Sequence, residues 1–526
     1  MPGMLNCPWP VGRRRGVALI TLACCSWLLA VPAVARDTLP LAVQASLTRL
    51  GVPASALGLV ALPLGHRARA YKFGADVPMQ PGSAMKLVTA VVALDRLSLV
   101  HVGRTRLRTL AVVEDGVLRG DLVLEGGGDP DFGFGPFYEM LSELRDQGIT
   151  RIDGDLVLDR NRYRPARLDV GAPPFDENPE RWWNVIPDAL LFEGGLLPVE
   201  LRADKAATQI SVRTKPRIDG LVIDSSALTP REGPCAGWDD SWATPRSTGT
   251  AQGVVVTLQG SFPRGCSRSE SMQIVDRTQL LGLVFAQIWR QLGGQWTGKV
   301  REAEPPPVSA LPATAAESRV LVDRRSRPWA ETLRPLMKTS DNTLTRLLFL
   351  EIGVRAAAVQ QAAVPSLVNT TSTLDIARAD VRRWFDEQRI PAPGLVVDNG
   401  SGLSRSERIT PMTLALLLQH VWRSPGAADV LMSLPVAGVD GTLRNRLKES
   451  PAAGTARLKT GTLRNVAALT GVVLDAQKRP WAVALIVNHD IGSGARPLLD
   501  AFVDHIARFG PHGSGRLPAG PLGDAP

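Results

Sequence analysis

Hydrophobic and polar positions along the chain predict a mixture of helices and strands. Between residues 83 and 97, hydrophobic side chains cover almost every face of a helix, which is typical of a helix buried at the centre of a domain. Two apolar runs, 466–474 and 481–488, flank a polar segment and predict an antiparallel hairpin. Residues 498–509 have a helical pattern and predict a closing helix.

The middle third of the chain predicts short strands separated by turns. Residues 107–124 alternate in short runs, and further strand-like runs follow at 155–158, 209–213, 221–223 and 254–258. The glycine-rich segment 126–130 lacks the spacing of a nucleotide-binding loop, so we expect a turn there. Residues 302–316 contain four prolines and predict a linker.

The N-terminus has the pattern of an export signal. Three arginines at 13–15 precede an apolar run over residues 16–32, and small residues at 33–35 offer a cleavage site before Arg36. We therefore expect a signal peptide over residues 1–35 and an exported, soluble mature protein. A retained membrane anchor is the alternative, and a lipoprotein attached through Cys24 is a weaker one.

Length and charge narrow the class of protein. A chain of 526 residues has room for three or four domains at roughly 150 residues each. The net charge of +9 is spread along the sequence, with no basic stripe and interleaved aromatic residues, so a nucleic-acid partner is not expected. A basic surface leaves peripheral association with anionic lipids or polymers open. The sequence does not indicate an oligomeric state.

Two cysteines remain after removal of the signal peptide. These are Cys235 and Cys266, and an oxidising compartment would let them pair. We treat this disulfide as a hypothesis.

Histidine and metal chemistry have little support in the sequence. None of the six histidines has metal-ligand spacing with a cysteine or another histidine, and no G-x-S-x-G segment with an obvious histidine partner occurs. We therefore expect neither a metal nor another cofactor.

A serine and a lysine at the start of the buried helix offer a different nucleophile. Ser83 and Lys86 are three residues apart, so their side chains share one helix face. Serine needs a base within hydrogen-bond reach, and burial makes it easier for a lysine to lose its proton. Backbone N–H groups at a helix N-terminus can also hold an oxyanion.

Two further short motifs suit the same site. Ser340 and Asn342 offer a hydroxyl for proton relay and a carboxamide for substrate positioning. The segment 459–462 (KTGT) precedes the predicted hairpin and should lie on a strand, where Lys459 and hydroxyls could hold a carboxylate and Gly461 allows close approach. The three motifs in this order arise by accident on the order of a few times in a thousand.

Together the motifs resemble those of penicillin-binding proteins and serine β-lactamases. The segments 81–87, 120–130, 338–342, 398–405 and 459–462 are similar to those of the D-alanyl-D-alanine carboxypeptidase/endopeptidase group, the class C low-molecular-mass penicillin-binding proteins. The resemblance implies an α+β fold with a β-lactamase/penicillin-binding-protein-like catalytic domain and nested, β-rich inserted domains.

The spacing of the motifs fits the insertion that is known in this group. Ser83 and Ser340 are 257 positions apart, which leaves room for one or two domains between them. The resemblance implies a discontinuous catalytic domain, an inserted domain II, a domain III nested in it, and a disordered tail. Their predicted limits are 36–106 with 319–510, 107–132 with 218–318, 133–217, and 511–526.

The resemblance also implies a role for each motif residue. Ser83 would attack the carbonyl of the penultimate D-Ala with Lys86 as its base, and Ser340 with Lys459 would pass a proton to the leaving amine. Asn342 would bind the peptide amide. Thr460 and Thr462 would hold the terminal carboxylate, and the N–H groups of Ser83 and Thr462 would form the oxyanion hole. Leu403, Arg405 and Leu463 would line the pocket for the acyl-side peptide.

The sequence departs from the family at three places. Arg346 occupies the fourth position after Asn342, where relatives commonly carry an acid, and Asn399 is an extra residue before the glycine-serine-glycine segment. Family members often have a Trp followed closely by an Asp that meets the free amine of diaminopimelate. Here Trp182 and Trp183 are present, but Asp188 is not at the expected offset.

We predict from these residues a periplasmic serine DD-carboxypeptidase or DD-endopeptidase that acts on peptidoglycan stem peptides and is acylated by penicillin and other β-lactams. A β-lactamase or esterase of the same fold is an alternative, which the long insertion disfavours. A catalytically weak cell-wall-binding or scaffold protein is the alternative from another class.

Overall fold

The computed structural model describes residues 37–206, 208–239, 241–250, 252–305, 318–364 and 371–513. The predicted signal peptide, most of the predicted linker and residues 514–526 of the predicted tail lie outside this part of the chain.

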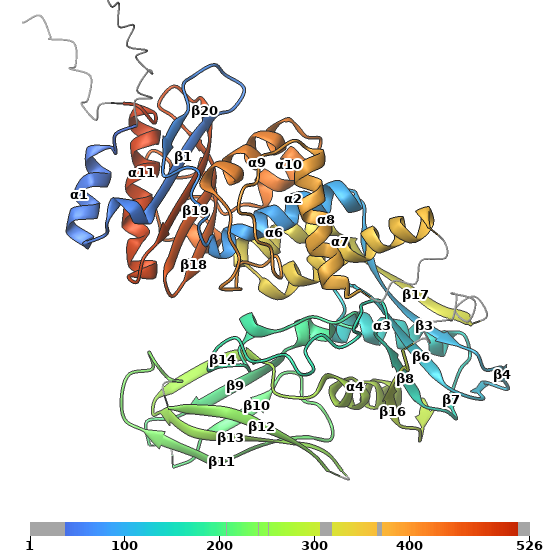
Figure 1. Ribbon diagram of the computed structural model, residues 1–526. Helices are drawn as coiled ribbons and strands as arrows, with labels where there is room; N and C mark the ends of the chain where they lie inside the picture. Colours follow the sequence, from blue (N-terminus) through green and yellow to red (C-terminus); the bar gives the residue numbers. More distant parts are fainter. Residues whose placement is uncertain are drawn as a thin grey trace, which may run out of the picture. The chain divides into compact units, whose positions relative to one another are not determined.

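A five-stranded antiparallel sheet joins both ends of the described chain. Its strand order is β18-β19-β20-β1-β2, so the C-terminal hairpin pairs with an N-terminal strand (Figure 1). The bounds are β1 Leu57–Pro63, β2 Tyr71–Phe73, β18 Arg457–Leu463, β19 Val466–Leu474 and β20 Pro480–Asn488. Strands β19 and β20 are the hairpin predicted over 466–488, which is thereby confirmed.

Successive residues of this sheet pack into two different hydrophobic cores. Leu59 and Leu485 join one core with helices α1 (Leu41–Leu50) and α11 (Arg496–Phe509). Val60 and Ile486 join the other core with α2 (Met85–Leu97) and α9 (Pro411–Arg423). Because strand side chains alternate between the faces of a sheet, an apolar strand with no polar positions is buried on both sides.

Helix α2 is central to the second core. Eleven of its thirteen residues are buried, as the all-round apolar pattern predicted. It packs beside α6 (Trp329–Thr339), α7 (Asn342–Ala363) and α8 (Thr373–Glu387), with α10 (Ala427–Ser433) next to α6 and α9 (Figure 1). The N-terminal end of this buried helix is where the site described below begins.

Two mixed sheets follow α2 in the chain, in the orders β16-β8-β6-β3-β17 and β15-β7-β5-β4. Helices α3 (Phe134–Asp146) and α4 (Arg277–Gln291) contribute to the same hydrophobic core. The strand bounds are β3 Val102–Thr109, β4 Val113–Glu114, β5 Val117–Leu118, β6 Leu122–Gly127, β7 Arg151–Ile152, β8 Leu156–Asp159, β15 Gln295–Trp296, β16 Val300–Glu302 and β17 Arg319–Pro328.

The predicted turn in the glycine-rich segment begins later than the sequence suggested. Gly126 and Gly127 still belong to β6, and only Gly128 has a left-handed backbone, with φ of 69°. A side chain on Gly126 would collide with the backbone of Ala189, so the strand needs glycine for close packing rather than for a bend.

Two three-stranded sheets lie within residues 197–272, in the orders β10-β9-β14 and β11-β13-β12. Their bounds are β9 Leu197–Ala203, β10 Ser211–Thr214, β11 Leu221–Arg231, β12 Trp242–Thr250, β13 Gly253–Pro263 and β14 Cys266–Met272.

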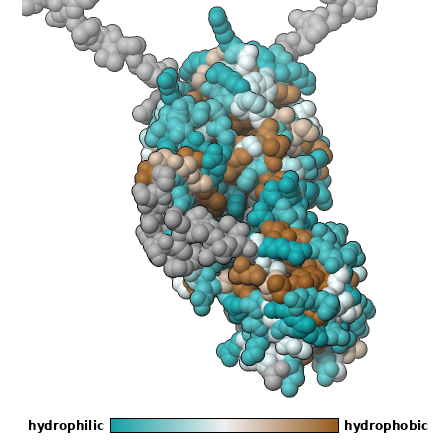
Figure 2. Space-filling view, turned by 90° about the vertical axis from the view of Figure 1, so that its right-hand side faces the viewer, coloured by the Kyte–Doolittle hydropathy of each residue, from teal (hydrophilic) through white to brown (hydrophobic). Residues whose placement is uncertain are grey.

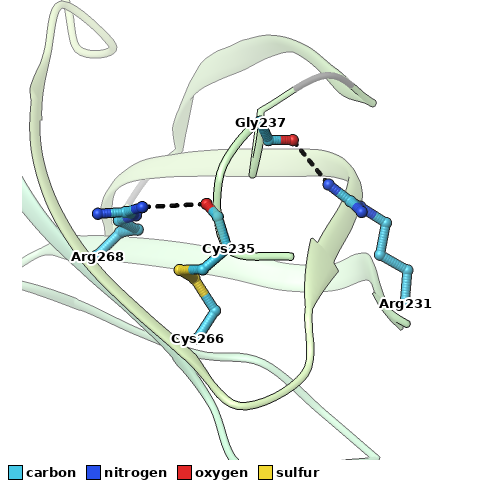
Figure 3. The surroundings of a disulfide bond; sticks show 5 residues. All are labelled: Arg231, Cys235, Gly237, Cys266 and Arg268. Carbon is cyan, nitrogen blue, oxygen red and sulfur yellow. Dashed lines mark hydrogen bonds between the residues drawn. A yellow bond between two sulfur atoms is a disulfide. The ribbon is translucent and has the colours of Figure 1, made fainter. Parts of the chain in front are cut away.

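Cys235 and Cys266 form a disulfide in this region (Figure 3). Their Cα atoms are 5.5 Å apart, within the usual range for a disulfide. The carbonyl of Cys235 also accepts a hydrogen bond of 3.1 Å from Arg268, so the loop before β12 is held to β14 by two bonds.

The predicted domain limits stay a prediction. Strands β7 and β8 fall inside the stretch predicted as domain III, and they pair with β5 and β6 of the stretch predicted as domain II.

The surface mixes hydrophilic and hydrophobic residues. On the face shown in Figure 2, hydrophobic patches lie between larger hydrophilic areas, as is usual for protein surfaces. Across the described residues, no helix combines the length and the apolar character that crossing a membrane requires.

Candidate active site

Ser83 lies on a short 3-10 turn, Gly82–Ala84, directly before α2. Lys86 occupies the first turn of α2 and is completely buried. Its Nζ atom lies 3.1 Å from Ser83 Oγ, so the predicted i, i+3 pair is in contact.

The other two partners of Lys86 are carbonyl oxygens from distant segments. Its Nζ donates to Asn342 Oδ1 at 2.6 Å and to the backbone carbonyl of Ser401. Burial lowers the pKa of Lys86 well below its usual value, and the charge of Lys459 lowers it further. A neutral amine has two N–H groups and one lone pair, which match these two carbonyls and the hydroxyl of Ser83.

Ser340 and Asn342 are placed by the junction between two helices. Helix α6 ends at Thr339, and Ser340 follows in a left-handed conformation with φ of 62°. The carboxylate of Asp341 then caps α7 by accepting a 2.8 Å hydrogen bond from the N–H of Leu344. This sharp reversal directs the serine and the asparagine to one cavity.

Lys459 lies on the edge strand β18, as the sequence predicted for this motif. Its Nζ donates to Ser340 Oγ at 2.7 Å and to the carbonyl of Thr460 at 2.9 Å. Burial lowers its pKa from 10.5 to about 7, so the amine can both give and take a proton near neutral pH.

Three glycines let the motif segments approach one another. A Cβ on Gly461 would overlap the carbonyl oxygen of Pro81, and one on Gly82 would lie 3.0 Å from the backbone nitrogen of Thr462. A Cβ on Gly402 would overlap the carbonyl of Gly82. The backbone of β18 therefore runs directly beside the turn that carries the serine.

A cavity of about 760 Å³ opens above these residues. Lys86, Lys459 and Gly461 are buried and are not among the described residues that line it. Eight of the predicted site residues line it: Ser83, Ser340, Asn342, Leu403, Arg405, Thr460, Thr462 and Leu463. No histidine is among the described residues that line it.

Residues from the inserted part of the chain form another wall of the cavity. Phe175, Asp176, Glu177, Trp182 and Trp183 all line it. The carboxylate of Asp176 accepts a 3.0 Å hydrogen bond from the indole of Trp183, and the backbone carbonyl of Trp183 accepts one of 3.0 Å from Asn342 Nδ2. Family resemblance pointed to Trp182 and Trp183 in the sequence, whereas Phe175, Asp176 and Glu177 were missed because no periodic pattern marks them.

Asp188 has a structural place instead of a place in the cavity. Its carboxylate is completely buried, 3.1 Å from Arg160 and 2.9 Å from Arg277. The acids that do reach the cavity are Asp176 and Glu177, upstream of the tryptophans.

Three arginines that the sequence analysis did not single out also line the cavity: Arg446, Arg464 and Arg496. Arg446 forms an ion pair with Asp500 at 2.7 Å, and Arg496 donates a 3.3 Å hydrogen bond to the hydroxyl of Thr462. Because the chain is rich in arginine, no local signal distinguished these three.

The departures from the family pattern have a local explanation. Arg346 is buried and donates to the backbone carbonyls of Asn184 and Val185 at 3.2 and 2.8 Å. Asn399 accepts hydrogen bonds from the hydroxyl and the N–H of Ser401 at 2.6 and 3.1 Å. Both residues support neighbouring backbone.

A serine at the start of a buried helix, in contact with one lysine and close to a second lysine on the adjacent edge strand, is an arrangement typical of a serine hydrolase. The chain belongs to the D-Ala-D-Ala carboxypeptidase 3 (S13) family, whose model matches residues 41–506. This confirms the predicted family and the predicted enzyme class, a serine-type D-Ala-D-Ala carboxypeptidase.

Named relatives agree with this assignment over most of the chain. A D-alanyl-D-alanine carboxypeptidase of an Actinomadura species is 27% identical, covering 95% of this chain and 92% of the relative. The D-alanyl-D-alanine carboxypeptidase DacB of Haemophilus influenzae is 26% identical, covering 82% of this chain and 85% of the relative.

Solved structures confirm the predicted α+β fold with its insertion. Penicillin-binding protein 4 (DacB) of Haemophilus influenzae matches with a TM-score of 0.70 at 21% identity, covering 89% of this chain and 99% of the relative. The same protein in complex with a β-lactam matches with a TM-score of 0.66.

Proposed function

We propose that this enzyme cleaves the terminal D-alanyl-D-alanine bond of peptidoglycan stem peptides through an acyl-enzyme on Ser83, and that penicillin acylates the same oxygen. The observation that carries the proposal is the set of contacts of Lys86 Nζ: two carbonyl acceptors and the hydroxyl of Ser83. That set suits a neutral lysine whose lone pair takes the hydroxyl proton.

Acylation then follows from the geometry. Ser83 Oγ bonds to the carbonyl carbon of the penultimate D-alanine as its proton moves to Lys86, and the backbone N–H groups of Ser83 and Thr462 hold the resulting oxyanion. Ser340 passes a proton from Lys459 to the leaving amine as the C–N bond breaks. Water then cleaves the ester and restores the serine hydroxyl.

The two sides of the cavity suit the two sides of the scissile bond. On the leaving-group side, the hydroxyls of Thr460 and Thr462 would hold the terminal carboxylate, and Arg496 beside Thr462 adds positive charge. On the acyl side, Leu403 and Leu463 provide apolar surface, and the guanidinium of Arg405 lies over the ring of Phe175 at 5.1 Å.

We include DD-endopeptidase activity on cross-linked peptides in the proposal. The cavity is larger than a single terminal D-alanine requires, and its wall carries Asp176 and Glu177, which suit an amine-bearing peptide branch. Digestion of purified cell wall, followed by mass spectrometry, should release both free D-alanine and cleaved cross-links. Release of D-alanine alone would restrict the activity to carboxypeptidase.

We also propose export to the periplasm and, from the net charge of +9, peripheral association with anionic lipids or cell-wall polymers. N-terminal sequencing of the protein purified from a periplasmic fraction should begin at Arg36. A protein that retains residues 1–35 would contradict cleavage of the signal.

Labelling with a fluorescent penicillin tests the nucleophile. We expect covalent labelling of the wild type, its loss in Ser83→Ala and in Lys86→Ala, and no change in Ser211→Ala, which removes an exposed hydroxyl from β10. Folded wild-type protein that takes no label would instead support a scaffold. Labelling of Ser83→Ala at the wild-type rate would overturn the assignment of the nucleophile.

A further inference from the structure

A buried carboxylate that the mechanism above does not use lies behind Lys86. The side chain of Glu407 is completely buried. Its Oε1 accepts hydrogen bonds from three successive backbone N–H groups, those of Asp398 and Asn399 at 3.2 Å and that of Gly400 at 2.8 Å. Its Oε2 is buried without a hydrogen-bond partner among the described residues. A buried carboxylate with one oxygen that lacks a hydrogen-bond partner is costly to the fold, because a charge removed from water needs compensating contacts.

The turn that Glu407 holds leads directly to the catalytic lysine. The residue after Gly400 is Ser401, whose backbone carbonyl accepts a hydrogen bond from Lys86 Nζ. The carbonyl of Gly400 accepts a second bond, of 2.7 Å, from the hydroxyl of Thr89, one helical turn after Lys86 on α2. The carboxylate thus organises the backbone that receives one of the two N–H groups of the neutral lysine.

We propose that Glu407 is a positioning residue for acylation: it fixes the turn that orients Lys86, and its negative charge stabilises Lys86 when that amine takes the proton of Ser83. This inference rests on the proposed function, because it assigns Lys86 the part of the base.

The charges around Lys86 explain why a second acid is needed. Lys459 on β18 and Arg346 on α7 face Lys86 and oppose any positive charge on it. Asp341 and Glu407 are the acids that favour that charge. Burial raises the pKa of Asp341, and its carboxylate already caps α7.

The surroundings of Glu407 bring its pKa close to neutral pH. Burial raises its pKa to about 7. The backbone N–H groups of Gly400 and Asp398 and the charge of Lys86 oppose that rise, and the charge of Asp398 adds to it. Arg346 also faces Glu407, and its guanidinium is fixed by the carbonyls of residues 184 and 185. The negative charge of Glu407 and the positive charge of Lys86 therefore favour each other, so the titrations of the two groups are coupled.

The variant Glu407→Gln separates charge from shape. Glutamine keeps an oxygen for the three N–H groups but carries no charge. Without that charge the pKa of Lys86 should fall further. The acylation rate decreases at low pH as Lys86 becomes protonated, and this decrease, the acid limb of the pH profile, should therefore move to lower pH. The rate on the plateau should fall about tenfold, because a weaker base is less effective. Glu407→Asp, which retains the charge, should keep the wild-type acid limb.

Rates are measured with a fluorescent penicillin between about pH 5 and about pH 9, a range that extends to both sides of the pKa of about 7 of Glu407. The matched control is Asp475→Asn, which neutralises a buried carboxylate at the β19–β20 turn and should leave the acid limb unmoved. Thermal unfolding checks that each variant is folded.

The outcomes distinguish this inference from the proposed function. If the wild type is acylated and Glu407→Gln has the wild-type rate and pH profile, the inference is wrong while the proposed function stands. A slower variant with an unmoved acid limb would also overturn it, since lost geometry alone would explain that result. If the wild type is not acylated at Ser83, the proposed function itself fails.

Discussion

Replacing Lys459 by methionine should make the protein more stable while abolishing acylation. Lys459 is completely buried, and burial lowers its pKa from 10.5 to about 7. The unfolded chain therefore binds more protons at this position than the folded protein between pH 7 and pH 10.5. Wild-type stability should rise with pH across that window, and the cost of burying the lysine is fully present at pH 7 and below.

The magnitude follows from the shift in pKa. A difference between 10.5 and about 7 corresponds to a cost of about 5 kcal/mol in the free energy of unfolding. Methionine has a similar length and no charge, but it loses the hydrogen bonds to Ser340 Oγ and the carbonyl of Thr460. At about 1 kcal/mol each, these reduce the expected gain at pH 7 to about 3 kcal/mol, or on the order of 3 °C in the midpoint.

The assay is thermal or denaturant unfolding of wild type and Lys459→Met across the alkaline range, with penicillin labelling beside it. The advantage of the variant should shrink by about 1.4 kcal/mol per pH unit above pH 7 and vanish near about pH 9. A variant that is less stable than the wild type at pH 7, or a difference that does not change with pH, would show that burial does not lower the pKa of Lys459 in this way.

Three other changes test separate parts of the site and the fold. Gly461→Ala should displace β18 from the carbonyl of Pro81, slow acylation by at least about tenfold and lower the thermal midpoint, because overpacking costs about 1–3 kcal/mol; unchanged labelling would argue against close approach. Arg496→Gln should raise KM for a peptide with a terminal carboxylate and leave a carboxylate-free ester unaffected in steady-state assays; an equal effect on both would contradict a role in carboxylate binding. Replacing both disulfide cysteines by serine should cost about 3–4 kcal/mol of local stability in the chain-entropy model, seen as an earlier unfolding step, with penicillin labelling retained; an unchanged unfolding profile would refute this.

The sequence predicted the elements whose chemistry or periodicity is local. The buried helix after Ser83 and the hairpin after Lys459 each have a continuous apolar pattern, so they were found with nearly correct bounds. The serine and lysine motifs were recognisable because the chemistry needs those residue types at fixed spacing. The spacing of the motifs along the chain does not show that the three motifs meet in one site, and that prediction came from the resemblance to the family.

The missed parts of the site have no local pattern that could reveal them. Asn342 is held by the backbone carbonyl of Trp183, and a backbone contact leaves no trace in residue type. Asp188 follows the tryptophans and still belongs to a buried ion-pair cluster, whereas Asp176, which precedes them, lines the cavity. Which of these two acids lines the cavity depends on how the inserted part of the chain folds.

The bonds between the start of α7 and residues 183–185 set a limit on how far this enzyme can be simplified. Asn342 donates to the carbonyl of Trp183, and Arg346 donates to the two carbonyls that follow. Removing the middle of the chain to obtain a minimal catalytic core would leave Asn342 and Arg346 without these acceptors. The guanidinium of Arg346 would then be buried without hydrogen bonds to these carbonyls. The insertion therefore cannot simply be removed, because Asn342 and the segment around it would have to be redesigned at the same time.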